Sequence, residues 1–319
     1  MKPGRQARST RAIMLTVAGC LLPGLIAAAW LIDPVGVLEN AVTALLAAFA
    51  TERACTTARR VPVPLLDTDP AAAVTALIIA AALPPGAIGP VAGAVFVALT
   101  LGKHVYGGLG SNIFNPAMVG YAVMLVSFPA AMADWPVITA PTEAAGATVD
   151  ALTGATVLTT FKYRGTATVA ESWTAANGFG HLGGLGYEWV GVAFLAGGVV
   201  LMALKMAAWR PCAGMLAALV ALALVGYDNG SSASLGSPMF HLFSGGTLLA
   251  ATFVATDPVS HPSGHGNQWR FGAVVGALTW IIRAWGNYPD GIAFAVLLGN
   301  AVTPFLDRRT VPRSEIADG

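Results

Sequence analysis

Ten apolar segments alternate with short polar stretches along most of the chain. Their bounds are 12–32, 36–51, 71–83, 87–102, 117–133, 189–204, 211–227, 239–255, 271–285 and 291–306. A helix rises about 1.5 Å per residue, so roughly 20 apolar residues cross the hydrocarbon core of a bilayer. The pattern therefore predicts an all-α polytopic membrane protein with about ten transmembrane helices.

Several of these segments are shorter than a full crossing. Segments 71–83 and 87–102 are separated by Pro84-Pro85-Gly86, which predicts a tight helical hairpin. Short or broken helices are tolerated at membrane depth where they line a site. A fold of tilted, packed helices explains the short lengths equally well.

The composition agrees with a membrane location. Hydrophobic residues make up 55% of the 319 residues and charged residues 10%, whereas a soluble domain carries about 25% charged residues. The net charge of +1 is dispersed, so no nucleic-acid partner is indicated. The three cysteines, Cys20, Cys55 and Cys212, form no metal-binding or disulfide pattern and are interpreted as buried thiols.

Basic residues predict the orientation of the chain. Four of them precede segment 12–32, as in a signal peptide, but this segment is long enough to span and no clear cleavage site follows, so we expect a retained first span. With a cytoplasmic N-terminus, 14 of the 17 Lys and Arg residues lie inside and 3 outside. The positive-inside rule favours that arrangement.

Three regions follow from this topology. Residues 1–134 and 187–319 each form five spans, with both termini cytoplasmic, and residues 135–186 form a long outer, periplasmic loop. No Asp, Glu or Lys falls in the middle of a predicted span, while Glu39 and Arg283 lie near span ends. Intramembrane ionisable residues are typical of ion-coupled carriers, so their absence counts against an independent transporter. Asp-Pro pairs at 69–70 and 257–258 would not occupy equivalent places in two five-span units, so we infer no repeat from them.

The outer loop contains the first candidate site. It has 52 residues, ten of them threonines, and is too long for an idle connection. Within it lies Asp150-Ala-Leu-Thr153-Gly154-Ala155-Thr156, where the two small residues leave room for a bulky group near the backbone. The alternatives are a capping role for Asp150 and an ordinary turn role for Thr156.

A second candidate site is the segment from Tyr106 to Pro116. It combines three glycines with the amides of Asn112 and Asn115 beside Phe114. Glycines permit close approach to a ligand, and amides supply both donors and acceptors. The plainer interpretation is a helix start with Asn115 as N-cap and Pro116 in the first turn. We expect both, with Asn115 capping and Asn112 freer to bind.

Two further polar segments have structural explanations. Asp257 follows segment 239–255 and could cap backbone groups or pair with Arg270. His261 and His265 lack a third ligand, so no metal site is predicted. The segment Trp285-Gly-Asn-Tyr-Pro-Asp-Gly291 is a turn by its chemistry, with aromatic residues suited to the membrane interface.

These four segments together resemble the RnfD family of the Rnf electron-transport complexes and, more distantly, the B subunit of sodium-pumping NADH:quinone oxidoreductase. The likeness runs from about Arg11 to Arg313 and is strongest over 106–129 and 287–313. In that family the last threonine of the Asp-x-x-Thr-Gly-Ala-Thr pattern bears FMN through a phosphoester. The resemblance thus implies covalent FMN on Thr156, and Thr153 is the competing acceptor within the motif.

The resemblance also implies a second, non-covalent flavin of riboflavin type near Asn112 and Asn115. The expected function is a flavin-bearing subunit of an ion-translocating oxidoreductase in the bacterial inner membrane, coupled to Na⁺ or H⁺ movement and inactive alone. No NAD fingerprint or iron–sulfur cysteine cluster is present. The partners implied are other Rnf subunits, including a second covalent-flavin subunit and iron–sulfur subunits. The alternatives are a secondary carrier or channel without a redox cofactor, and a structural scaffold.

Overall fold

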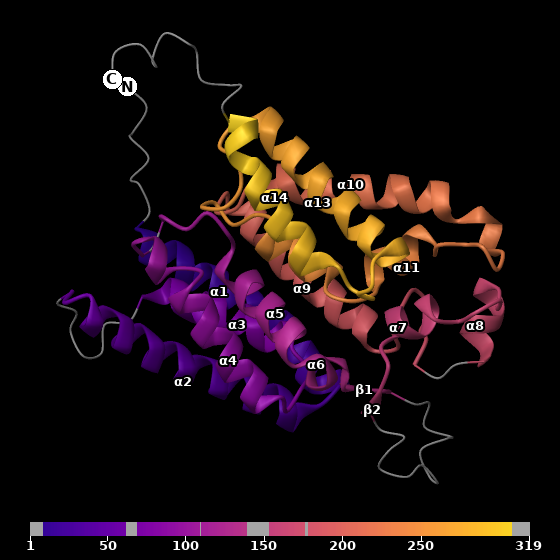
Figure 1. The fold of residues 1–319 in the computed structure, drawn as a ribbon, viewed down its shortest axis with the longest axis horizontal. Coiled ribbons are helices and arrows are strands. Elements are labelled where there is room, and N and C mark those ends of the chain that lie inside the picture. Colours follow the sequence, from indigo (N-terminus) through magenta and orange to yellow (C-terminus); the bar gives the residue numbers. More distant parts are fainter. Residues whose placement is uncertain (1–8, 62–68, 109, 139–152, 176–177, 308–319) are drawn as a thin grey trace.

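A computed structural model describes residues 9–61, 69–108, 110–138, 153–175 and 178–307. Two groups of helices lie side by side, one from the N-terminal half of the chain and one from the C-terminal half (Figure 1). A smaller unit of short helices, α7 (Val157–Lys162) and α8 (Val169–Ala175), lies at one end of the second group. The fold is helical apart from one short antiparallel pair of strands in the described residues.

Three helices of the N-terminal group begin with the same capping pattern. A side-chain oxygen accepts a backbone N–H from the first turn, and proline follows at the first helical position; the capping residues are Asp33, Asp69 and Asn115. The helices are α1 (Thr10–Leu31), α2 (Pro34–Ala58), α3 (Pro70–Ala82), α4 (Ile88–Thr100), the 3₁₀ turn η1 (His104–Tyr106), α5 (Pro116–Ser127) and α6 (Pro129–Ala133).

The described part of the connection between the groups contains two short strands and two short helices. Strand β1 (Trp135–Pro136) pairs antiparallel with β2 (Thr153–Gly154), so that Trp135 lies opposite Gly154. Helices α7 and α8 follow. Rings from Phe161, Trp173 and Phe240 pack together at the contact with the second group, which holds this small unit in place.

The C-terminal group is also helical. Its elements are α9 (Tyr187–Ala203), α10 (Trp209–Gly226), the 3₁₀ turn η4 (Asp228–Gly230), α11 (Pro238–Phe243), α12 (Thr247–Leu249), the π-helical turn η5 (Ala250–Val254), α13 (His265–Trp285) and α14 (Ile292–Asp307).

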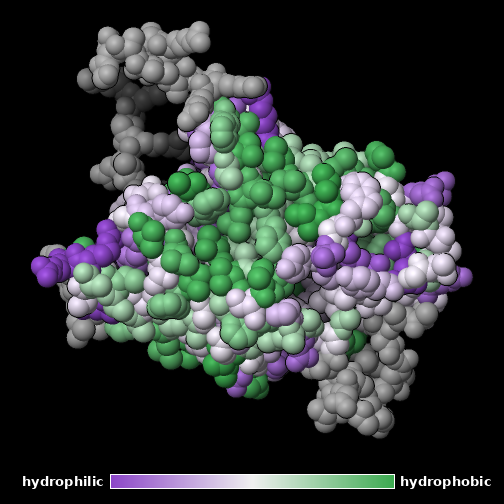
Figure 2. All heavy atoms as spheres, in the orientation of Figure 1, coloured by the Kyte–Doolittle hydropathy of each residue, from purple (hydrophilic) through white to green (hydrophobic). Residues whose placement is uncertain are grey.

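All ten predicted apolar segments are helical. Segment 117–133 is split between α5 and α6, because Pro129 cannot continue the hydrogen-bond pattern of α5. Segment 239–255 is split at Ser244-Gly245-Gly246. Three helices in the described residues are long and apolar enough to cross a membrane: Thr10–Leu31, Pro34–Ala58 and Ile88–Tyr106. Exposed apolar side chains cover much of the middle of the molecule (Figure 2).

The two halves pack their helices in a similar way, although we inferred no repeat from the Asp-Pro pairs of the sequence. In the first half α2 packs against α3 and α4, and α4 against α5. In the second half α10 packs against α11 and α13, and α13 against α14. Helix α1 joins its counterpart α9 across the boundary. The repeat is therefore one of tertiary packing rather than of sequence motifs.

Glycines allow the closest helix contacts. A Cβ atom at Gly276 of α13 would overlap the backbone of Met215 in α10, and one at Gly197 of α9 would overlap the backbone of Cys20 in α1. Small residues at such points let two backbones approach, as membrane helices commonly do.

Candidate functional site

Thr156 lies at the start of α7. Its Oγ1 accepts the backbone N–H of Thr159 at 3.3 Å and lies 3.0 Å from the Thr159 hydroxyl. Thr156 is therefore the N-cap of this short helix and is half-buried. In the chain as folded, Thr156 thus has a capping role rather than the ordinary turn role given as its alternative. An ester oxygen keeps the lone pairs that accept such a bond, so capping does not conflict with a role as attachment point.

Thr156 also lines a large cavity between the two helix groups, which we call the Thr156 cavity. Its open space is about 1320 Å³, including the part continuous with solvent. The wall is mostly apolar and comes from α3, α5, α7, α9, α12, η5 and the strand β1. Apolar cavities with a few polar groups are the usual form of cofactor sites.

Few polar side chains face this cavity, and two of them bond to backbone carbonyls of the protein. The Tyr187 hydroxyl donates to the carbonyl of Pro136 at 2.8 Å, and Trp135 Nε1 donates to the carbonyl of Met132 at 3.1 Å. Tyr121 and Asp290 also line the wall. No described Lys or Arg does so.

Asp290 is held in place by Arg283. Its Oδ1 accepts from Arg283 Nη2 at 3.1 Å and from Arg283 Nε at 3.3 Å. The buried guanidinium also donates to the carbonyl of His241 at 2.8 Å and to the Thr247 hydroxyl at 2.9 Å. Because all of these partners lie in one rigid network, the Asp290 carboxylate has a fixed position at the cavity wall.

Gly245 leaves the space that this arrangement needs. Its φ of +63° is in the left-handed region, and a Cβ there would overlap Asp290 Oδ2 and come within 2.8 Å of Leu158. Only glycine satisfies both demands at this point.

The other residues of the predicted motif have mixed outcomes. Asp150 lies outside the described residues, so its capping role stays a prediction. The backbone of Thr153 pairs with Pro136 in the two-stranded ladder. Among the described residues, a Cβ at Gly154 would meet Val137 alone, at a contact distance of 3.4 Å.

A second cavity lies at the other end of α3 and α5, and we call it the Asn112 cavity. Its open space is about 800 Å³. The wall combines apolar residues of α1, α3, α9 and η5 with polar residues from three connecting segments: Lys103, Asn112, Asn115, Thr256 and Asp257. The sequence motif around Asn112 and Asn115 therefore does border a cavity.

Asn115 is fully engaged by the protein. Its Oδ1 caps α5 by accepting the Met118 N–H at 3.2 Å, and its Nδ2 donates to Asp257 Oδ2 at 3.2 Å. Its backbone N–H donates to Asn300 Oδ1 at 3.0 Å. The predicted capping role is confirmed. Asn112 has a single described side-chain bond, from Nδ2 to the carbonyl of Phe114 at 3.0 Å, so it is the freer of the two amides.

Asp257 is the acid of this cavity. Burial raises the pKa of its carboxyl, while hydrogen bonds from Val259 and Ser260 lower it. The predicted capping of backbone groups is confirmed, because Oδ1 accepts the Val259 N–H at 3.2 Å. The alternative pairing with Arg270 is not found in the described residues, and Arg270 instead donates to Asn267.

Beside the Asn112 cavity lies a buried cluster of charges. Lys103 Nζ donates to both carboxylate oxygens of Glu52, at 3.0 and 2.9 Å, and to Asp69 at 2.8 Å. His104 Nε2 lies 3.0 Å from Glu52 Oε2, and Arg59 Nη1 lies 3.2 Å from His104 Nδ1. The sequence did not reveal this cluster, because α2 continues past the predicted segment end and buries Glu52.

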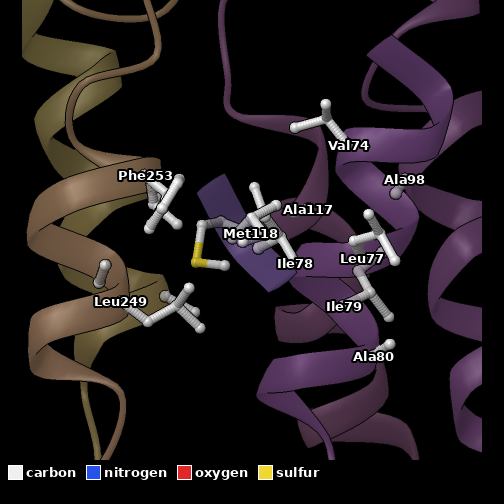
Figure 3. Packing of buried hydrophobic residues seen from close by; sticks show 14 of the residues in the cluster. Val74, Leu77, Ile78, Ile79, Ala80, Ala98, Ala117, Met118, Leu249 and Phe253 are labelled. Carbon is white, nitrogen blue, oxygen red and sulfur yellow. The ribbon is translucent and has the colours of Figure 1, made fainter. Parts of the chain in front are cut away.

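The two cavities are separated by a layer of apolar side chains. Figure 3 shows Met118, Ala117 and Ile78 from the N-terminal group facing Leu249 and Phe253 from the C-terminal group. These residues belong to helices whose ends line one cavity or the other. Thr156 lines the first cavity and Asn112 the second, so this layer lies between the two candidate motifs.

The remaining predictions concern metals and thiols. Within the described ranges no group of three or more His, Cys, Asp and Glu side chains could hold a metal ion. Cys20 and Cys212 are buried and unpaired, as expected, while Cys55 is half-buried.

Comparisons with known proteins decide the family. The model of the NQR2, RnfD, RnfE family matches residues 4–315. The chain belongs to this family. Its similar relatives include proteins named as the D subunit of an ion-translocating oxidoreductase complex. The one from Pseudomonas aeruginosa is 46% identical, over 97% of this chain and 93% of the relative. That from Cellvibrio japonicus is 39% identical over 97% and 91%, and that from Vibrio cholerae is 38% identical over 97% and 96%.

The match to the NQR2, RnfD, RnfE family spans nearly the whole chain, so it includes the residues that line both candidate cavities. Sequence reasoning missed Tyr121 and Asp290 as cavity residues of this family member. Tyr121 lies inside an apolar helix. Asp290 lies in a turn sequence, and turn formation is already a sufficient reason for an aspartate there. A polar residue inside an apolar helix is the signal that could have identified Tyr121.

Proposed function

We propose that this chain is the flavin-bearing membrane subunit of an ion-translocating oxidoreductase complex. The observation that carries the proposal is the position of Thr156, which closes a complete Asp-x-x-Thr-Gly-Ala-Thr pattern and lines the larger of the two cavities described. Relatives that share 38–46% identity over nearly the whole chain are named as the D subunit of such a complex. The chain works within that complex and has no complete reaction of its own.

Thr156 would carry FMN through a phosphoester, with the ring inside the Thr156 cavity. A bound flavin supplies transfer of one or two electrons, and the protein holds and tunes it. Thr156 anchors the cofactor through the phosphate, far from the reactive ring. Apolar residues such as Phe194, Leu249 and Val254 exclude water from the cavity wall. This division of labour explains why the cavity needs few polar groups.

The Asn112 cavity would hold a second, non-covalent flavin of riboflavin type. Asn112 is placed to contact the ring, whereas Asn115 serves as a frame that ties α5 to Asp257 and Asn300. Two flavin sites at the two ends of one boundary suit a subunit that moves electrons between partners. Those partners would include iron–sulfur subunits and a second covalent-flavin subunit, with Na⁺ or H⁺ movement coupled to the electron flow.

The proposed topology has ten spans, in residues 1–134 and 187–319, with both termini cytoplasmic and 135–186 periplasmic in the bacterial inner membrane. The ten helical segments and the 14-to-3 distribution of basic residues support it. A reporter fused after residue 319 should report cytoplasmic, and one inserted between 140 and 150 should report external. An external C-terminus would contradict this topology.

Denaturing gel electrophoresis with in-gel flavin fluorescence tests the central proposal, because only covalent flavin survives it. Thr156→Ala should give a membrane-inserted chain without fluorescence, and Thr153→Ala should keep it. Full fluorescence in Thr156→Ala, or loss only in Thr153→Ala, would overturn the assignment. Absence of fluorescence in the unaltered chain, produced in a host that assembles the complex, would favour the alternative of a carrier or channel.

A further inference from the structure

Two polar groups on the described wall of the Thr156 cavity are already committed to the protein. The hydroxyl of Tyr187 and the indole N–H of Trp135 are both directed to backbone carbonyls. In the described part of the chain no hydrogen bond engages the Tyr121 hydroxyl. A flavin ring has one apolar end and one polar edge, so its orientation in this cavity depends on where Tyr121 and Asp290 lie.

Asp290 offers one carboxylate oxygen to the cavity. Oδ1 is occupied by Arg283 and by the Ile292 N–H at 3.3 Å. Oδ2 accepts a single long bond from the Gly246 N–H at 3.4 Å. A carboxylate oxygen accepts more than one bond, so Oδ2 has capacity for another donor. The buried guanidinium of Arg283 pairs with the carboxylate and fixes its orientation.

Tyr121 approaches the cavity from α5, in the opposite helix group. It is half-buried, packs against the main apolar core and lines the cavity with Met118 of the same helix. A phenol both donates and accepts, and its ring holds the hydroxyl at a defined distance from the backbone. Tyr121 and Asp290 therefore face one space with complementary groups, a donor and an acceptor.

We propose that Tyr121 and Asp290 position the flavin ring in the Thr156 cavity, an inference that rests on the proposed role of Thr156. Asp290 Oδ2 accepts the imide N–H of the ring, and the Tyr121 hydroxyl donates to a neighbouring ring carbonyl. Both are positioning residues that also set the reduction potential. The Asp290 carboxylate opposes added negative charge on the ring, and the Tyr121 donor favours it.

Two substitutions should move the potential in opposite directions. Asp290→Asn keeps an acceptor oxygen but removes the charge. The equilibrium constant for reduction of the flavin should therefore rise about tenfold, which corresponds to a reduction potential about 59 mV higher for one electron. Tyr121→Phe keeps the shape of the side chain and loses the donor. The equilibrium constant for reduction should therefore fall about fivefold, and the potential should fall with it. The measurement is a redox titration of the visible flavin absorbance, on the full chain purified from membranes.

Controls separate this role from a structural one. Tyr163→Phe alters an exposed hydroxyl away from the cavity and should change nothing. Tyr187→Phe removes a hydroxyl from the same wall that already bonds to Pro136, so it should lower thermal stability without moving the potential. In-gel fluorescence must persist in all four variants, because the attachment point is intact.

The outcomes distinguish this inference from the proposed function. If Thr156→Ala keeps its fluorescence, the proposed function and this inference both fail. If Thr156→Ala loses fluorescence but Tyr121→Phe leaves the potential and spectrum unchanged, only this inference fails. Equal shifts in Tyr187→Phe and Tyr121→Phe would also overturn it, because loosening of the wall would then explain both. Should Asp290→Asn not fold, Tyr121→Phe alone decides.

Discussion

The Thr156 cavity and the Asn112 cavity lie along one boundary between two similarly packed helix groups, yet they differ in chemistry. The first is apolar with one fixed acid, Asp290, and no described cation on its wall. The second borders Asp257, two amides and the buried ammonium of Lys103. The proposed covalent anchor at Thr156 would make many polar contacts unnecessary, because attachment removes the need for binding energy from the ring. A cofactor without an anchor depends on the wall for all of its affinity.

The way in which each cavity is stabilised also differs. Charges support the Asn112 cavity, since Lys103 links carboxylates from α2 and from the start of α3. At the Thr156 cavity, one ion pair and one obligatory glycine support the wall. Substitutions in the supports of the two cavities should therefore change the stability of the protein by different amounts, so the comparison can be tested.

The largest effect should come from Lys103→Met. It leaves the buried Glu52 carboxylate without its ammonium partner, and breaking a buried ion pair in this way costs about 3–5 kcal/mol. Thermal unfolding of the detergent-purified chain should show a large fall in melting temperature. The control is Lys205→Met, at an exposed position, which should change stability by about 0.5 kcal/mol at most. Equal stability of both variants would show that the cluster is not a structural support.

A somewhat smaller effect is expected from Gly245→Ala. An L-residue in the left-handed region costs about 1–2 kcal/mol, and the added methyl group overlaps Asp290 and Leu158. Overpacking of this kind costs about 1–3 kcal/mol. Gly246→Ala is the matched control, because its φ is −87° and a Cβ would have 4.0 Å to Ile292. Thermal unfolding should separate the neighbours clearly, and similar melting temperatures would mean that the wall adjusts.

The smallest effect should be seen in Asn112→Leu. Leaving one partner of a buried hydrogen bond unsatisfied costs about 1–3 kcal/mol, which is roughly ten- to hundredfold in affinity. Acid extraction of the purified complex should release less riboflavin-type flavin, while the flavin linked to Thr156 stays behind as internal standard. Asn287→Leu, at an exposed position, is the control. Unchanged flavin content would reduce Asn112 to a loop residue and remove the contrast between the cavities.

Much of the fold could be predicted because its signals are local. Apolar runs of helical length identify the ten helical segments, and an Asp or Asn before proline marks where α2, α3 and α5 begin. Capping by Asn115 follows from the same signal, since it needs only residues within one turn. The helix breaks near Phe128 and Ser244 were harder to predict from the sequence. An apolar run does not show where a helix bends to close around a cavity.

The sequence by itself determined the helical class, the approximate positions of the ten helical segments, the threonine motif and the two asparagines that border a cavity. Tertiary structure alone decided which of these side chains have capacity left for a ligand. Asn115 is committed through Asp257 and Asn300, which lie 142 and 185 residues away in the chain. Tertiary structure also brought Tyr121 and Asp290 to one wall. Such partners come from segments far apart, and the pairing energy depends on burial and distance, neither of which a linear pattern encodes.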